Sequence, residues 1–184
     1  MNRSMHHILR EATRTEHESL DALFGSLDLA DERDFARFLT AHLIGAEALD
    51  GIFRRFVSEN LDCDPPAFPR MVRGDLEAMG DTPADLPRIA VPDDLDPAGI
   101  TYVICGSRLG LAVMRKQDYW GKQAGAANRY MEDDSGLALW RSLTGWMSQR
   151  TLAADEMDRA VLAARHAFDV FRQAFALSGA AARR

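Results

Sequence analysis

Hydrophobic residues recur at helical spacing along nearly the whole chain. Between residues 4 and 24 they form a stripe with a period of about 3.6, consisting of Ile8, Leu9, Ala12, Leu20, Leu23 and Phe24. No segment shows the strict polar–apolar alternation that is typical of a half-buried strand. The pattern therefore predicts an all-α protein whose first helix covers about residues 4–24.

A second, longer helix is predicted to begin at Asp31, whose carboxylate can accept hydrogen bonds from the free N–H groups of a first turn. One face of this helix is apolar, and His42 lies at the centre of that face, so we expect a core histidine with a satisfied ring. The apolar positions are Phe35, Phe38, Leu39, Leu43, Ala46, Leu49, Phe53 and Phe56. The stretch DCDPPAFP at 62–69 ends the helix.

The rest of the chain predicts four more helices. A short one covers 70–79 and ends at Gly80, after which three prolines mark 81–96 as an irregular connection. Asp96-Pro97 begins a helix that is predicted to run to about residue 117, since proline is favoured at the first helical position. A loop rich in Gly and Asn follows, and then helices at about 136–149 and 153–177. With no internal repeat, residues 1–184 are expected to form one domain.

Composition narrows the classes of protein that this chain can belong to. Its 184 residues are 47% hydrophobic, which argues against disorder, and a net charge of -6 argues against nucleic acid as a partner. The two cysteines, Cys63 and Cys105, form no C-x-x-C pair, so neither a disulfide framework nor a Cys-type zinc site is indicated. The start lacks the apolar run of a signal peptide, and no window has the length of a membrane span. We therefore expect a soluble, cytoplasmic protein with no membrane partner.

The stretch YVICGSRLG at 102–110 places two glycines one turn apart on a predicted helix. Each costs ~1 kcal/mol relative to alanine in a helix interior. Gly106 and Gly110 would let another surface approach the backbone closely. The pair alone favours tight helix packing over ligand binding, although the polar Ser107 and Arg108 between them are not needed by an apolar contact.

A second candidate group lies on the first helix, where His17 stands at the edge of the apolar stripe. A histidine there is usually a partly buried surface residue. Asp21 follows one turn later, however, where a carboxylate can orient the imidazole as it does for metal-bound histidines. Arg10 precedes it by two turns on nearly the same face. An imidazole with a cation two turns away suits a flat metal complex that has acidic side groups.

Other chemistries find little support. The sequence has no H-E-x-x-H or E-x-x-H, and it has no Gly-rich phosphate loop or G-x-S-x-G. His166 is interpreted as structural, and His6 and His7 as an exposed terminus. If the chain is an enzyme, these absences favour chemistry that is carried by a cofactor.

Taken together, two segments resemble the haem oxygenases, in particular the bacterial kind associated with bacteriophytochromes. LREATRTEHESLD (9–21) resembles the proximal-helix signature of that family, and YVICGSRLG (102–110) resembles its distal helix. Weaker likeness is found in RGDLEAMG (73–80), NRYMEDDSGLALWRSL (128–143) and AARHAFDVFRQAF (163–175). The segments follow the family order over most of the chain.

The resemblance implies a helical bundle in which haem lies between the first helix and a kinked distal helix. By position, His17 would be the proximal iron ligand and Asp21 its orienting partner. Gly106 and Gly110 would be the distal glycines, which leave room for O2 at the iron.

The resemblance also implies roles for the substrate's other groups. Arg10 matches the family's basic position for the haem propionates, Arg141 is a second candidate cation, and Tyr102 would add a hydroxyl. Haem would be both cofactor and substrate, cleaved with O2 to biliverdin, CO and ferrous iron. Electrons would come from a ferredoxin- or reductase-type donor, and the biliverdin would supply a bacteriophytochrome.

Two positions depart from the family pattern. Leu111 follows the second distal glycine, where relatives often carry another small residue, and Ser107 stands where some relatives carry an aspartate. Two other functions therefore stay open. One is a haem-binding protein that stores or senses haem without degrading it, and the other is a helical interaction module in which the glycine pair serves packing.

Overall fold

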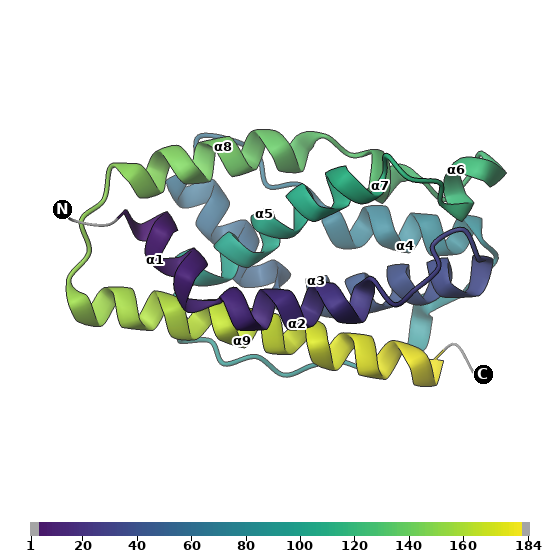
Figure 1. Cartoon of the computed structure of the whole chain (residues 1–184), viewed down its shortest axis with the longest axis horizontal. Coiled ribbons are helices and arrows are strands. Elements are labelled where there is room, and N and C mark those ends of the chain that lie inside the picture. Colours follow the sequence, from purple (N-terminus) through teal and green to yellow (C-terminus); the bar gives the residue numbers. More distant parts are fainter. Residues whose placement is uncertain (1–3, 182–184) are drawn as a thin grey trace.

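The structure, a computed structural model, describes residues 4–181, and every regular element in that range is helical (Figure 1). The all-α prediction is confirmed, whereas a single domain over 1–184 stays a prediction. The elements are α1 (Met5–Ala12), α2 (Arg14–Phe24), α3 (Glu32–Asn60), α4 (Phe68–Ala78), the 3-10 turn η1 (Pro83–Asp85), α5 (Pro97–Met114), α6 (Trp120–Ala124), α7 (Arg129–Glu132), α8 (Ser135–Ser148) and α9 (Ala154–Ala181).

The predicted first helix is wrong in one respect, because it is broken at Thr13 into α1 and α2. The Thr13 hydroxyl and its backbone N–H both donate to the Leu9 carbonyl, at 2.8 and 3.0 Å. A threonine side chain that bonds four residues back competes with regular helix geometry, and Thr13 has φ -111° and ψ 12°. Figure 1 shows the result, since α1 descends steeply into a nearly horizontal α2.

The capping signals in the sequence define the helix starts correctly. Asp31 accepts from the N–H groups of Arg33 and Asp34, at 2.9 and 3.1 Å. Asp96 does the same for the turn that begins at Pro97. Gly80 follows the end of α4 with a φ of +88°, a conformation that glycine adopts without strain.

The chain between α5 and α8 differs from its prediction. Helix α5 ends at Met114 rather than near residue 117, and the expected loop contains the short helices α6 and α7. Helices α8 and α9 lie within a few residues of their predicted bounds. Helix α5 is one continuous helix from Pro97 to Met114. The kink expected in it stays a prediction.

The core forms where α3, α5 and α9 pack against one another. Helix α5 packs closely against α9 at Gly99, where a Cβ atom would overlap the Ala160 carbonyl and the Ala164 N–H. The expectation that no window has the length of a membrane span is wrong for α5, whose length and mean hydropathy of 1.3 would suit one. The buried core helix of a soluble protein matches the same criteria. The second half of α5, from Gly106 onward, forms one wall of a cavity.

Candidate functional site

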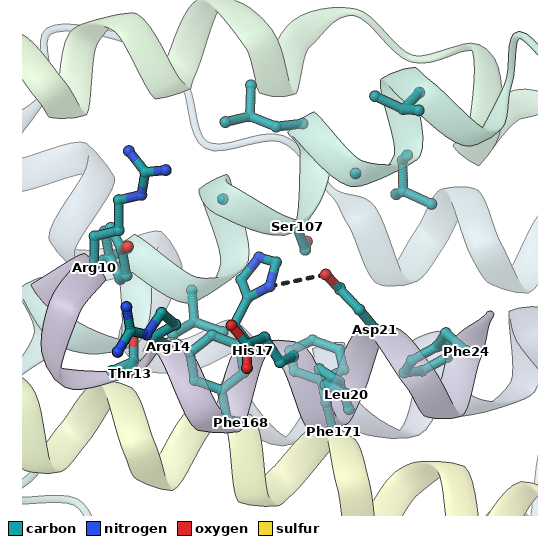
Figure 2. A pocket seen from close by; sticks show the side chains of 18 of the residues that line it. Arg10, Thr13, Arg14, His17, Leu20, Asp21, Phe24, Ser107, Phe168 and Phe171 are labelled. Atoms are coloured by element: carbon teal, nitrogen blue, oxygen red, sulfur yellow. Dashed lines mark ion pairs between the residues drawn. The ribbon is translucent and has the colours of Figure 1, made fainter.

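A cavity of about 890 Å³ separates α1 and α2 from the second half of α5 (Figure 2). Volumes of a few hundred to 1,000 Å³ are typical of small-molecule sites. Its apolar lining comes from α2, α3, α5, α8 and α9, and consists of Leu20, Phe24, Phe38, Val103, Leu109, Leu111, Val113, Met114, Trp140, Phe168 and Phe171. The polar groups that the sequence singled out are set into this apolar surface.

His17 and Asp21 lie on the cavity side of α2. The His17 Nδ1 is 2.9 Å from the Asp21 Oδ2, and the ring edge rests against Phe168, with centroids 5.9 Å apart. An ionised carboxylate can only accept, so in the neutral imidazole we assign the proton to Nδ1, which leaves the Nε2 lone pair free for a metal. The His17 side chain is 57% exposed, so this nitrogen is accessible to a ligand.

Gly106 and Gly110 lie across the cavity on α5. Apart from chain neighbours and the backbone of α5 itself, a Cβ atom at Gly110 would meet no atom of the described residues within 4 Å, and one at Gly106 would only touch the Trp140 ring at 3.7 Å. Packing within this fold therefore requires glycine at neither position. Ser107 also lines the cavity, and its hydroxyl donates to the Ile104 carbonyl at 2.8 Å.

Basic side chains gather at the end of the cavity next to the break at Thr13. Arg10, from the last turn of α1, and Arg14, from the first turn of α2, both line the wall. In the described part of the chain no ion pair joins either arginine to an acidic side chain. Sequence reasoning missed Arg14, although its spacing of one turn from Arg10 was a usable signal.

The same end of the cavity contains a cluster of three aromatic rings. His6 was predicted to be exposed, and that is wrong: the ring is partly buried, with centroids 5.5 Å from Trp140 and 6.1 Å from Tyr102. Burial, followed by the charges of Arg10 and His7, lowers the pKa of His6. Burial also raises the pKa of Tyr102. The packing of α1 against α8 brings these rings together, and no local sequence pattern predicts this contact.

His42 is the core histidine that was predicted, and it also reaches the cavity wall. It is 6% exposed, with its Nδ1 2.9 Å from the Phe38 carbonyl and its ring against Phe24 and Phe38. Burial lowers its pKa to about 4, although the carbonyl hydrogen bond acts in the opposite direction. His42 is therefore a neutral imidazole at neutral pH.

Arg141 is the predicted site residue that the structure does not bring to the others. It is exposed on α8, outside the cavity wall, whereas its neighbour Trp140 lines the cavity. One residue turns a helix by roughly 100°, so a shift of one position exchanges an inward for an outward side chain. Leu111, by contrast, is buried in the wall at 3% exposure. Among the described residues, no group of three or more His, Cys, Asp or Glu side chains is placed to hold a metal ion.

This arrangement of helices is the haem oxygenase fold. The structure is similar to that of the haem oxygenase from Neisseria meningitidis, which was solved in NO- and CO-bound forms, with a TM-score of 0.77. The likeness covers 96% of this chain and 94% of the other, at 23% sequence identity. No protein-family model and no curated protein matches the sequence. The likeness therefore shows the fold, and function has to be argued from the site.

Proposed function

We propose that this protein is a soluble, cytoplasmic haem oxygenase that binds haem in the cavity and cleaves it to biliverdin, CO and ferrous iron. The observation that carries the proposal is the pair Gly106 and Gly110. These glycines lie on a cavity wall, across from an oriented histidine, where no packing neighbour requires them. Glycines kept at a helical cost without a packing reason are best explained by a ligand that needs their space.

The residues present fit haem. The cavity has apolar and aromatic walls for a flat macrocycle, the free Nε2 of His17 for its iron, and cations at one end for its two carboxylates. When bound, haem would supply the redox chemistry with O2 and would itself be the molecule consumed.

Each side chain then has a defined task. His17 would hold the iron, while Asp21 keeps its ring in one tautomer and orientation. Arg10 and Arg14 would hold the carboxylates through charge-assisted hydrogen bonds, with the Tyr102 hydroxyl as a further donor. The glycines would leave the distal space free. Arg141 lies outside the wall, and we leave it out of this set.

The neutral His42 adds a polar group to the apolar wall. A carbonyl can only accept, so the Nδ1 of His42 carries the proton and its Nε2 is an acceptor. Because the Ser107 hydroxyl is already bonded within α5, it is a weaker candidate for holding water in the cavity. We therefore assign the role of holding water in the cavity first to His42.

A hemin titration followed by a turnover assay tests the proposal. We expect a Soret band that saturates at one hemin per chain. With a reductase, O2 and catalase we expect the band to decay as biliverdin absorbance appears. Saturation without biliverdin would contradict the enzymatic function, and the lack of a Soret band would contradict haem binding altogether. Hemin saturation without biliverdin would support storage or sensing of haem, the alternative that Leu111 next to the second glycine leaves open.

Two partners complete the proposal. A ferredoxin- or reductase-type protein would donate the electrons, and the biliverdin would supply a bacteriophytochrome. Both rest on the resemblance of residues 9–21 and 102–110 to the bacterial enzymes. Reconstitution with each donor type, followed by transfer of the product to an apo-bacteriophytochrome, would test them.

A further inference from the structure

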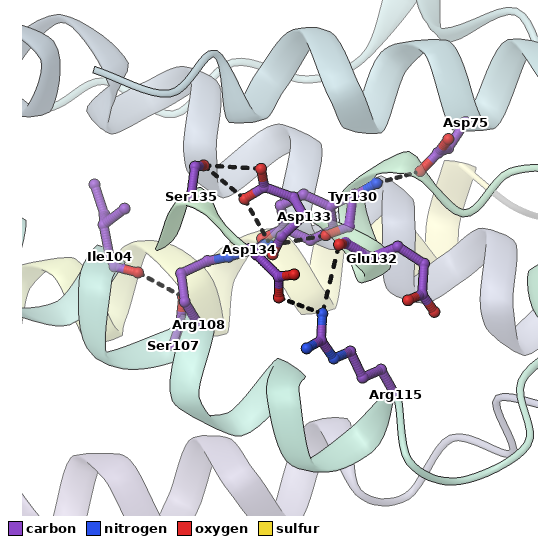
Figure 3. Close-up of polar contacts among 10 residues, drawn as sticks. All are labelled: Asp75, Ile104, Ser107, Arg108, Arg115, Tyr130, Glu132, Asp133, Asp134 and Ser135. Atoms are coloured by element: carbon purple, nitrogen blue, oxygen red, sulfur yellow. Dashed lines mark hydrogen bonds and ion pairs between the residues drawn. The ribbon is translucent and has the colours of Figure 1, made fainter. Parts of the chain in front are cut away.

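The second half of α5 is held in place from the side that faces away from the cavity. Arg108 and Arg115 are two turns apart and therefore share one face, which lies roughly 160° around the helix from Gly106 and Gly110. Both arginines reach the segment that joins α7 to α8 (Figure 3). The cavity side of the same stretch is open, as the free space around Gly110 shows.

Arg108 is an unusual residue for a helix interior, because its charge is almost fully buried. The side chain is 2% exposed, and its guanidinium lies over the rings of Tyr130 and Phe68, at 4.4 and 4.8 Å. One nitrogen, Nη2, donates to the Tyr130 carbonyl at 2.8 Å and to the Asp133 carbonyl at 3.2 Å, and it is 3.3 Å from the Asp133 carboxylate. In the described chain Nε and Nη1 have no hydrogen-bond partner.

The surface that receives Arg108 is itself fixed. The Asp75 carboxylate of α4 accepts from the backbone N–H groups of Arg129 and Tyr130, at 3.0 and 2.8 Å. The Ser135 hydroxyl donates to the Asp133 carboxylate at 2.8 Å. Figure 3 shows these contacts as one continuous set around Arg108. The guanidinium is thus bound to a rigid frame.

Helix α8 also leaves room for the arginine. A Cβ atom at the buried Gly136 would lie 2.5 Å from the Arg108 Cγ and 2.8 Å from its Nε. The first turn of α8 therefore carries a glycine where the arginine stem crosses it.

Burying a guanidinium has a large desolvation cost, and an apolar side chain often stabilises such a position as well or better. An apolar contact with Phe68 and Tyr130 would still allow α5 to slide and rotate. Directional hydrogen bonds and a planar group stacked on two rings would not. The buried Arg108 is therefore better explained as a residue that fixes the position of α5 than as one that stabilises the fold.

We propose that Arg108 is a positioning residue, which sets how closely the Gly106–Gly110 segment approaches a ligand in the cavity. This inference rests on the proposed haem site for its purpose, but the anchoring itself can be measured without haem. Arg115, paired with Asp134 at 2.7 Å at the surface, is a weaker second anchor on the same face.

The first measurement is hydrogen exchange in the haem-free protein. We compare the wild type with Arg108→Met, Arg108→Lys and Gly136→Ala, and use Arg159→Gln, in an exposed ion pair of α9, as the control. Gly136→Ala keeps the charge but pushes the arginine stem aside. Local opening of residues 106–114 should rise about tenfold in Arg108→Met and Gly136→Ala and less in Arg108→Lys, with no change in the control. Wild-type exchange in both Arg108→Met and Gly136→Ala would overturn the anchoring.

The second measurement links the anchor to the cavity. In the haem-loaded, reduced protein, the infrared stretching band of bound CO reports on the backbone that faces it. We expect a shifted and broader band in Arg108→Met and Gly136→Ala, partial recovery in Arg108→Lys, and a turnover loss of about 10- to 100-fold. A lowered melting temperature with an unchanged band would show a purely structural role and would overturn the inference. A wild type that binds no hemin would instead contradict the proposed function and leave the exchange result to decide on the anchor.

Discussion

The two halves of α5 use glycine for opposite physical reasons. In the first half, Gly99 lets the backbone of α9 approach so closely that a methyl group would overlap the Ala160 carbonyl. In the second half, a Cβ atom at Gly110 would meet no atom of the described chain within 4 Å apart from its two neighbours and the backbone of its own helix. The first glycine makes a contact possible, whereas the second keeps a space empty.

This difference is the opposite of what the glycine spacing in the sequence suggests about helix packing. The spacing of Gly106 and Gly110 is the one usually associated with close helix packing, yet the glycine that packs closely is the isolated Gly99. Spacing shows that two glycines share a face, but it does not show whether that face meets a helix or a cavity. The comparison therefore predicts that substitutions in the two halves affect different properties.

The largest expected effect is a loss of turnover when His17 is replaced, on the cavity wall opposite the second half of α5. We expect His17→Ala to retain hemin through the apolar walls and the arginines but to lose turnover, because the iron loses its protein ligand. Added imidazole should restore part of the activity by supplying the missing nitrogen. His166→Ala, on α9 outside the cavity wall, is the control. Full turnover without imidazole would assign the ligand to another residue, with His42 the first to test.

The second prediction concerns the glycines of the cavity half. Gly110→Ala should leave the unfolding free energy unchanged or raise it by up to ~1 kcal/mol, since alanine favours the helix and meets no neighbour. Turnover should nevertheless fall by about 10- to 100-fold, because the methyl group occupies distal space. Gly106→Ala should behave similarly, with a further contact to Trp140. Normal turnover in both variants would remove the functional difference between the halves.

Gly99→Ala should give the opposite result. The added methyl group has to displace backbone of α9, and such overpacking costs about 1–3 kcal/mol of stability. Chemical denaturation measures that loss, while hemin affinity per folded molecule should stay at the wild-type value. Gly51, on α3 with open space around its Cβ position, provides the matched control. A stable Gly99→Ala variant with weakened hemin binding would contradict the comparison.

The smallest expected effect is a pH dependence from His42 in the cavity wall. Its pKa is about 4 in the folded protein and near 6.5 when unfolded, so between these values only the unfolded state binds the proton. The resulting stability is complete above pH 6.5 and is lost as the pH falls toward 4. From about pH 7 to 5.5 this removes about 1 kcal/mol. Urea denaturation at both pH values should show a smaller difference in His42→Gln than in the wild type, and an equal difference would contradict the assignment.

The features that the sequence predicts well are the local ones. Asp31 and Asp96-Pro97 mark helix starts because caps act within one turn, and His17 with Asp21 is one turn of the same helix. These signals need no information about the rest of the fold.

The features that the sequence missed depend on tertiary contacts. His6 becomes part of the cavity only because α1 folds onto α8, and nothing in its neighbourhood differs from an exposed terminus. Arg108 stands out as a polar residue between the two glycines, but its burial is not predictable locally, because its partners Phe68 and Tyr130 are 22 or more residues away. The break at Thr13 had a local signal, because a threonine hydroxyl often donates to the carbonyl four residues earlier. Most threonines in helices make this bond without ending the helix, so the signal is weak.

That break has a consequence for the order in which contacts are lost. It separates the first helix into one piece that carries Arg10 and a second that carries Arg14 and His17, so under the proposed function the ligand's carboxylates would be held from both pieces and its metal from the second piece alone. A product without iron would no longer be held by His17, whereas Arg10 and Arg14 would still pair with its carboxylates. Departure of the open-chain product should then be limited by electrostatic attraction, and its rate should increase with ionic strength.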